Sequence, residues 1–222
     1  MELVDLSAIK LKLNNEKFLN PYIVKCIVLG HYGVGKSTMN HMFATGFFDP
    51  NISSTVAMDF YTKKLYLSDN QIVKVQVWDS AGQEKYRSII SSYIRDTYIT
   101  FIVFDITDRK SWDDVDIWKD LTDQKNNQEI SRIVLVGTKE DKKNHMISIE
   151  EIKNKADLWN CNYYITSSKH KNSANLIHQM FYNEVESLHQ QFINSTNPPI
   201  NILKEIKSLD LDDQEKNDSC CF

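Results

Sequence analysis

The chain has 222 residues, 41% of them hydrophobic, which is enough for one domain of ordinary size with its own core. The net charge of −4 argues against broad affinity for nucleic acid, and no apolar run approaches the length that spans a membrane. Only four cysteines occur, two of them adjacent near the C-terminus, so the composition argues against a disulfide framework and for a cytosolic protein.

Composition divides the chain into three parts. Residues 1–20 are a polar N-terminal extension, and residues 21–193 carry the recurrent apolar segments of a folded domain. Residues 194–222 hold two prolines, three lysines and six acidic residues, hence a net charge of −3. We expect this last part to be a flexible, acidic tail.

Six apolar segments rich in β-branched and aromatic residues predict strands, at residues 22–30, 56–67, 73–79, 99–106, 131–138 and 162–166. Several are apolar almost throughout, as strands covered on both faces are. Helical patterns lie between them, from Lys36 onward and at 111–124, 148–159 and 173–192. This alternation predicts an α/β fold, in which a mostly parallel sheet carries helices on both faces and binds ligands at the carboxyl ends of its strands.

Two of the expected helices begin with a serine. Ser111 is the expected N-cap of the helix at 111–124, in which apolar residues recur at helical intervals. Ser148 opens the helix at 148–159 and is followed three residues later by Glu151, which predicts a capping box.

Residues 30–38 read GHYGVGKST and contain the pattern Gly-x-x-x-x-Gly-Lys-Ser of a phosphate-binding loop. The loop follows a predicted strand and opens a helix, so the N–H groups of the glycine-rich turn and the helix N-terminus would point at phosphates. Lys36 would place positive charge on the β- and γ-phosphates, and the Ser37 hydroxyl would bind Mg²⁺. The loop by itself leaves a kinase, an ATPase and a GTPase open.

A second motif, VWDSAGQE at residues 77–84, follows another predicted strand. Asp79 is therefore expected at a carboxyl end beside the loop, where its carboxylate can reach Mg²⁺ through water. Gly82 offers a backbone N–H to the γ-phosphate, and Gln83 is a neutral side chain able to orient an attacking water. Beside the phosphate loop, this motif favours nucleotide hydrolysis over transfer to an acceptor.

Both motifs, together with KYRSIISSYIR at 85–95, FDITDRKSWDDV at 104–115 and WKDL at 118–121, resemble the Rab family of small GTPases. The resemblance covers roughly residues 20–193 and implies a three-layer P-loop NTPase G domain with a six-stranded sheet. It also implies two switch loops, at about 50–60 and 80–95, that fold according to the bound nucleotide and recruit effectors.

The resemblance assigns roles to single residues. Thr55 matches the switch threonine that reaches Mg²⁺ and the γ-phosphate, and Phe48 matches the aromatic residue that packs on the guanine face. The implied catalytic residues are Gln83 and Lys36, and the implied metal ligands are Ser37, Thr55 and, through water, Asp79. The residues expected to bind the nucleotide are Gly30, Gly33, Val34, Gly35, Lys36, Ser37, Thr38, Phe48, Thr55, Asp79, Gly82, Thr138, Lys139, Asp141, Ser167, Ser168 and Lys169.

Guanine recognition is expected from the segments TKED, 138–141, and SSK, 167–169. Asp141 would accept hydrogen bonds from guanine N1–H and the exocyclic amine, a donor pair that adenine lacks. Lys139 would lay its stem along the base. The Rab family usually has Asn where Thr138 stands; the Rho family is similar in tolerating Thr, so guanine preference is expected to survive, and weaker affinity with faster exchange stays open.

Tyr32 departs from the family, which usually has Ser, Ala or Gly at this position of the loop. Two interpretations stay open. The ring either lies near Gln83 and the path by which an activating protein inserts an arginine, which slows turnover, or folds outward over the nucleotide with little effect.

The adjacent Cys220 and Cys221, with one residue after them, resemble the double-cysteine ending of Rab proteins that receives two geranylgeranyl groups. Two lipids suit this tail, because one chain binds membranes marginally and an acidic segment supplies no polybasic second signal. The resemblance further implies an exchange factor, a GTPase-activating protein, a GDP-dissociation inhibitor or escort protein, and effectors.

The sequence therefore predicts a Mg²⁺-dependent GTP and GDP switch, on the cytoplasmic face of an intracellular membrane and cycling with the cytosol, that acts in vesicle trafficking. Two alternatives stay open. One is a scaffold that holds GTP and hydrolyses it slowly or not at all, which Tyr32 and Thr138 motivate. The other is a P-loop ATPase or small-molecule kinase, for which the sequence offers no acceptor-site motif.

Overall fold

A computed structural model describes residues 22–53, 55, 58–82, 87–127, 130–170 and 172–194, without the side chains of residues 87 and 88. The expected extension at 1–20, Gln83, and the tail with Cys220 and Cys221 lie outside these ranges. The division of the chain into three parts accordingly stays a prediction. Within the described ranges, none of the helices has the length and apolarity needed to cross a bilayer.

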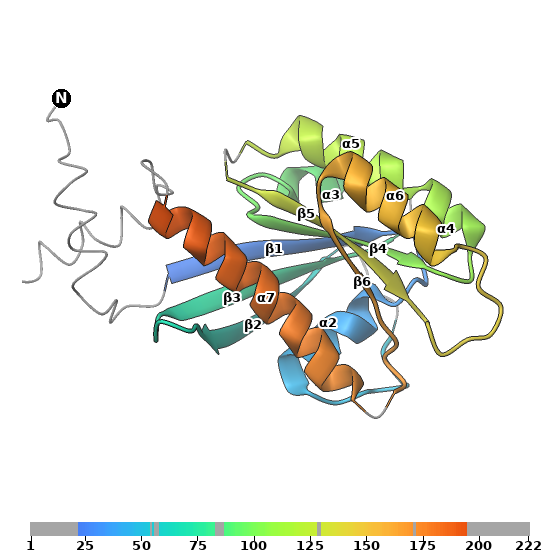
Figure 1. Ribbon diagram of the computed structural model, residues 1–222, viewed down its shortest axis with the longest axis horizontal. Helices are drawn as coiled ribbons and strands as arrows, with labels where there is room; N and C mark the ends of the chain where they lie inside the picture. The colour runs from blue at the N-terminus through green and yellow to red at the C-terminus, as the bar shows by residue number, and fades with distance from the viewer. Residues whose placement is uncertain are drawn as a thin grey trace, which may run out of the picture.

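Six strands form one sheet in the order β2-β3-β1-β4-β5-β6 (Figure 1). Only β2 and β3 pair antiparallel; the other neighbours are parallel. The strands are β1 (Tyr22–Gly30), β2 (Met58–Tyr66), β3 (Ile72–Ser80), β4 (Ile99–Asp105), β5 (Arg132–Thr138) and β6 (Asn162–Ile165). All six coincide with the predicted segments to within two residues at each end. The continuous apolar runs of β1, β4 and β5 reflect burial on both faces, whereas β2 is mostly half-buried or exposed.

The helices are α2 (Lys36–Thr45), α3 (Arg87–Tyr93), α4 (Arg109–Asp113), α5 (Val115–Lys125), α6 (Ile149–Trp159) and α7 (Ser173–Asn194). The predicted capping box on α6 is confirmed, since the Ser148 hydroxyl accepts from the Glu151 N–H and the Glu151 carboxylate accepts from the Ser148 N–H. The short α3 was not predicted from the periodicity.

The prediction of Ser111 as an N-cap was wrong. The helical segment begins earlier, as α4, with Asp108 as the cap that accepts from the Lys110 N–H, and a new helix follows Asp114. The Ser111 hydroxyl is instead buried inside α4, where it accepts from the Asp105 N–H at 3.0 Å and donates to the Asp108 carbonyl. Aspartate two residues before a helical N–H caps as well as serine does, so composition alone did not separate the two starts.

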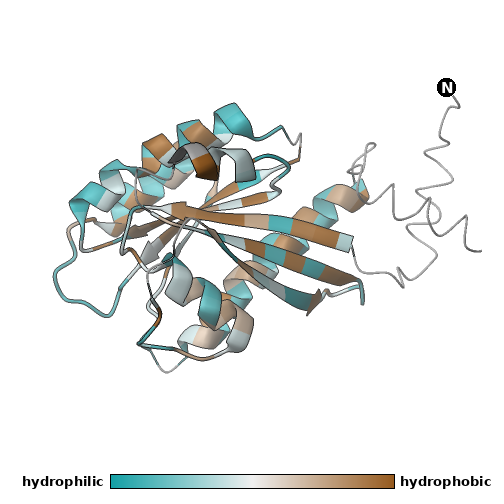
Figure 2. Ribbon diagram, turned by 180° about the vertical axis from the view of Figure 1, so that it is seen from behind, coloured by the Kyte–Doolittle hydropathy of each residue, from teal (hydrophilic) through white to brown (hydrophobic). Residues whose placement is uncertain are grey.

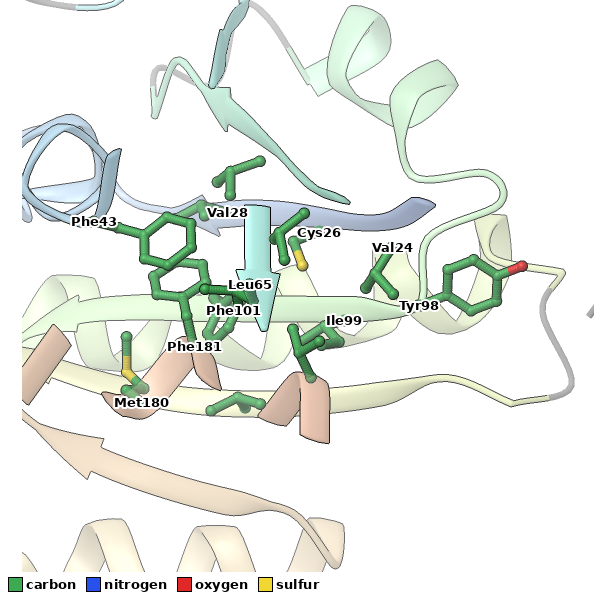
Figure 3. Packing of buried hydrophobic residues seen from close by; sticks show 14 of the residues in the cluster. Val24, Cys26, Val28, Phe43, Leu65, Tyr98, Ile99, Phe101, Met180 and Phe181 are labelled. Atoms are coloured by element: carbon green, nitrogen blue, oxygen red, sulfur yellow. The ribbon is translucent and has the colours of Figure 1, made fainter. Parts of the chain in front are cut away.

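Two apolar layers hold the helices on the sheet, and the hydrophobic residues run along the central strands (Figure 2). On one face, α2 and α7 pack on residues such as Val28 and Phe101, and the rings of Phe43 and Phe181 stack at 4.0 Å between centroids (Figure 3). On the other face, α3, α4, α5 and α6 pack on residues such as Leu29. The fold is thus the expected three-layer arrangement with a mostly parallel sheet.

The sheet register brings the predicted motifs together at one edge. Val28 of β1 lies beside Asp79 of β3, Gly30 lies beside Val103 of β4, and Asp105 lies beside Thr138. The carboxyl ends of four neighbouring strands therefore meet where the phosphate loop leaves β1, as ligand sites of open α/β sheets do.

Candidate nucleotide site

The phosphate loop approaches the sheet so closely that its first residue has to be glycine. Gly30 has φ 148°, and a Cβ there would lie 2.1 Å from the Val103 carbonyl oxygen. Gly33 and Gly35 have φ of 75° and 102°, in the left-handed region that favours glycine. The loop then enters α2 with Gly35 as the N-cap and with no acidic residue in the first turn. That helix N-terminus is suited to an anion.

Lys36 is 5% exposed, and its ammonium group contacts the backbone of the phosphate loop. Its Nζ donates to the Gly30 carbonyl at 3.0 Å and to the His31 carbonyl at 2.9 Å. Burial lowers the pKa of Lys36 to about 8, against the nearby charge of Asp79, which raises it. A Cβ on Gly82 would lie 2.5 Å from both the His31 carbonyl oxygen and Lys36 Nζ, so the backbone of the second motif packs directly on this lysine.

Three oxygen-bearing side chains lie together beside the loop. The Ser37 and Thr55 hydroxyl oxygens are 2.6 Å apart, and Thr55 donates to Asp79 Oδ2 at 3.1 Å. Asp79 Oδ1 has no hydrogen-bond partner among the described residues. Burial raises the pKa of Asp79 and outweighs the hydrogen bonds from Ser37 and Thr55 and the charge of Lys36. Two hydroxyls and one under-satisfied carboxylate are hard oxygen ligands, and they fit Mg²⁺.

A cavity of about 160 Å³ opens in front of these groups. Thr55 and Gly82 line it, and so does Tyr32, whose side chain is 50% exposed. The ring that departs from the family pattern therefore borders the same space as the residues expected around the γ-phosphate.

Thr138 ties the loop to the end of the sheet. Its hydroxyl is 2.6 Å from the Val34 carbonyl oxygen and 2.9 Å from the Phe104 carbonyl oxygen, and both are acceptors. Lys139 donates to the Gly33 carbonyl at 2.7 Å, so the last residue of β5 and the residue after it both contact the phosphate loop.

Lys139 also forms an ion pair at 2.8 Å with Asp105, which is 7% exposed. Burial raises the pKa of Asp105, but hydrogen bonds from Lys139 and Thr107 outweigh it, so the pKa lies below its usual value. Lys139 has φ 62°, an uncommon backbone conformation for a lysine, and its stem is held between the loop and β4.

Asp141 is positioned by the segment after β6. Ser167 donates to Asp141 Oδ1 at 2.5 Å, and the Ser167 oxygen accepts from the Lys169 N–H at 3.0 Å. The Ser167 hydrogen bond lowers the pKa of Asp141, so its carboxylate is ionised at neutral pH. A cavity of about 260 Å³ adjoins it, with Phe48, 41% exposed, on its border. Its other lining residues are Val34, Gly35, Thr38, Thr138, Lys139, Lys142, Ser168 and Lys169.

Apart from Gly30, Asp79 and Ser167, the predicted nucleotide-binding residues line two adjoining cavities that share Gly35 and Thr38. Those three residues form hydrogen bonds with residues of the lining. Sequence reasoning missed three contributors. Asp105 was visible as an acid at the end of a predicted strand, which is a usable signal. The contact of His31 with Asp114 and the burial of Asn40 left no signal in spacing or composition.

The sequence model of the Ras family matches residues 25–190. The chain belongs to the Ras family. Similar proteins include "Ras-related protein RabO" of Dictyostelium discoideum, 31% identical over 91% of this chain and 97% of its own. "Probable Rab-related GTPase" of Acanthamoeba polyphaga mimivirus is 31% identical over 97% of this chain and 98% of its own. Within the Ras superfamily of small GTPases, the chain is therefore Rab-like, as its motifs predicted.

Membership of the Ras family carries general properties. Ras-family proteins are GTPases that bind GTP and GDP, typically with Mg²⁺, and they work with regulators and effectors. In Figure 1, the phosphate loop lies between the end of β1 and the start of α2.

Proposed function

We propose that this chain is a Rab-like switch that binds GTP and GDP with Mg²⁺, hydrolyses GTP and controls a step of vesicle trafficking from a membrane. The observation that carries the proposal is that two suitable sites lie side by side at the carboxyl ends of the central strands. Lys36, Ser37, Thr55 and Asp79 suit a magnesium-bound phosphate chain, and Asp141, fixed by a hydrogen bond from Ser167, suits a guanine base.

Hydrolysis is assigned to in-line attack of water on the γ-phosphate. Buried Lys36 would neutralise charge on the transferred group, and Gln83 would orient the water. Bound Mg²⁺ would supply further positive charge to the phosphate oxygens, with Ser37 and Thr55 as ligands and Asp79 acting through water. Gly82 would donate its backbone N–H to the γ-phosphate, because no side chain keeps that backbone away from Lys36.

The nucleotide is the first quantity to measure. We expect GDP or GTP to co-purify with the protein, and calorimetry on stripped protein with Mg²⁺ to register tight binding of both and of neither adenine nucleotide. Asp141→Asn should lose most of the guanine preference, since the amide presents its own donors to guanine N1–H and the exocyclic amine. Bound ATP or ADP would instead support the ATPase or kinase alternative.

A slow or non-hydrolysing scaffold is the second candidate, and the position of Tyr32 beside Thr55 and Gly82 supports it. The ring borders the space in which an activating arginine, worth about 10³–10⁵ in rate, would have to enter. Under this candidate, Tyr32→Ser raises single-turnover GTP hydrolysis and the response to an activating protein. Equal rates for the native protein and Tyr32→Ser, with and without activator, would remove Tyr32 as a cause of slow turnover. Ready turnover of GTP by the native protein would remove this second candidate and leave the first.

Membrane attachment is assigned to geranylgeranyl groups on Cys220 and Cys221. Changing both to Ser should move the protein from the membrane to the soluble fraction of cells and leave GDP affinity unchanged, because the tail lies outside the predicted domain. The expected partners are an exchange factor, a GTPase-activating protein, a GDP-dissociation inhibitor or escort protein, and effectors. Membrane retention of the double variant would show that another feature anchors the chain.

A further inference from the structure

Asn40 is a polar residue in the buried face of α2, and its side chain is fully buried at 0% exposure. Residues three and four apart share a helix face, so Asn40 lies one turn beyond Lys36 and Ser37 on the same side. Those two residues face Asp79, and α2 packs on β3. The helix therefore directs one amide toward the carboxylate that its first turn surrounds.

Neither amide atom of Asn40 has a hydrogen-bond partner among the described residues. Such unpartnered groups are uncommon in protein interiors, because a buried amide loses its hydrogen bonds to water. Asp79 Oδ1 is also unpartnered, whereas Oδ2 accepts from Thr55. The Asn40 amide lies close enough to the Asp79 carboxylate to lower the pKa of Asp79, although burial raises that pKa more. The contact between the two groups does not reach normal hydrogen-bond geometry, because both amide atoms and Oδ1 are without a partner in the described part of the chain.

We propose that Asn40 is a positioning residue for the magnesium site, whose amide holds the Asp79 carboxylate in the orientation that the metal requires. Thr55 holds one carboxylate oxygen, and an amide directed at the other would fix the plane of the group. Side chains that orient a ligand in this way are worth about 10–100-fold in metal affinity. The inference rests on the proposed function, because it concerns the same magnesium site.

A purely structural role predicts a different behaviour. The buried residues of α2 around Asn40 include the apolar Met39 and Met42. Leucine has the same number and branching of side-chain heavy atoms as asparagine, although its two methyl groups take up more room. If Asn40 only filled space, Asn40→Leu would remove two unpartnered polar atoms and leave the metal site unaffected. If Asn40 positions Asp79, the same change weakens Mg²⁺ binding in a protein that still folds.

The test measures release of a fluorescent GDP analogue over a series of buffered free Mg²⁺ concentrations, with no turnover involved. For Asn40→Leu we expect the concentration at half-maximal retention to rise about 10-fold or more. The release rate in excess chelator should stay within about twofold of the native protein, because the metal is then absent from both. Asn40→Thr, which keeps a hydroxyl donor, should recover part of the shift. Met39→Leu on the same helix is the matched control and should behave as the native protein does.

A midpoint for Asn40→Leu within about twofold of the native value would overturn the inference and assign Asn40 a structural role. If Asn40→Leu does not fold, Asn40→Ala carries the same prediction and the same criterion. Failure of the native protein to bind the GDP analogue at any Mg²⁺ concentration would instead reject the proposed function. The two failures are therefore distinguishable in one experiment.

Discussion

At the scale of the residue, Thr138 has one hydroxyl proton for two carbonyl acceptors. The acceptors belong to Val34 in the phosphate loop and to Phe104 at the end of β4. One proton satisfies one strong hydrogen bond or two weaker ones, whereas an asparagine amide carries two protons. The threonine therefore closes the contact between loop and sheet less completely than asparagine would.

Thr138→Asn should consequently strengthen that contact and slow GDP release, by roughly 3–10-fold if one net hydrogen bond is gained. Thr138→Val keeps the shape and removes the donor, so release should become faster than in the native protein. The measurement is the dissociation rate of a fluorescent GDP analogue at saturating Mg²⁺. The same rate for all three proteins would mean that this contact does not limit release.

Lys36 offers a second residue-scale prediction, from its pKa of about 8. At pH values between about 8 and the ordinary lysine pKa of 10.5, Lys36 is mostly protonated in the unfolded chain and mostly deprotonated in the folded chain. The contribution of Lys36 to the free energy of unfolding therefore rises with pH in that window and is smallest below about pH 8. Bound phosphates favour the charged lysine, so nucleotide binding should reverse the shift.

We accordingly expect GDP binding to take up close to one proton at about pH 9 and well under half a proton at about pH 7.5. Calorimetry in buffers of different ionisation enthalpy measures this uptake directly. Equal uptake at the two pH values would show that Lys36 is already charged in the nucleotide-free protein.

At the scale of the element, the phosphate loop is tied to the helical layer on the other face of the sheet. His31 Nδ1 lies 2.7 Å from Asp114 Oδ2, at the junction of α4 and α5, and both side chains are less than 20% exposed. The carbonyl of His31 accepts from Lys36 Nζ. One side-chain contact therefore links the loop backbone that holds Lys36 to α5. In turn, α5 packs on α3, which lies in the expected second switch segment.

Removing the contact between His31 and Asp114 should loosen the loop backbone that holds Lys36. We expect His31→Ala and Asp114→Ala each to speed GDP release by roughly 3–5-fold, and the double variant to be no faster than either, a coupling of about 0.5–1 kcal/mol. The neighbouring Asp113→Ala is the matched control, because Asp113 is 63% exposed and pairs with Arg109 on the surface. Additive effects in the double variant would indicate that the two residues act independently.

At the scale of the whole molecule, α7 crosses one face of the sheet (Figure 1). The buried acid Glu184 joins this helix to β5 and β6, at one side of the sheet. Glu184 is 1% exposed and accepts from Asn162 and Tyr164, both at 2.8 Å, while Arg132 lies 3.5 Å from its other oxygen. This cluster lies at the amino ends of β5 and β6, away from the nucleotide site.

Glu184→Ala should lower the free energy of unfolding by about 3–5 kcal/mol, because it leaves the Arg132 charge without its buried partner. GDP release from the folded protein should be unchanged. Glu186, two residues further along α7, accepts hydrogen bonds from Ser68 near the surface, and Glu186→Ala should cost about 1 kcal/mol or less. Denaturant unfolding of both variants tests the difference, and equal losses would contradict the assigned role of burial.

Local sequence patterns were sufficient to predict the six strands, most of the helices and most of the residues that meet at the candidate site. Segments rich in β-branched and aromatic residues identified the six strands. The Ser148 and Glu151 pattern identified the start of α6, and the order of motifs identified the family. These features are local in the chain, so spacing and residue type are sufficient to read them.

Contacts between side chains that are far apart in the chain could not be predicted and became visible in the folded domain. His31 and Asp114 are 83 residues apart and Tyr22 and His189, which share a hydrogen bond, are 167 apart. The burial of Asn40 beside Asp79 likewise depends on how α2 packs on β3. Such contacts depend on sheet register and helix packing over the whole domain, and no local pattern of residues encodes them.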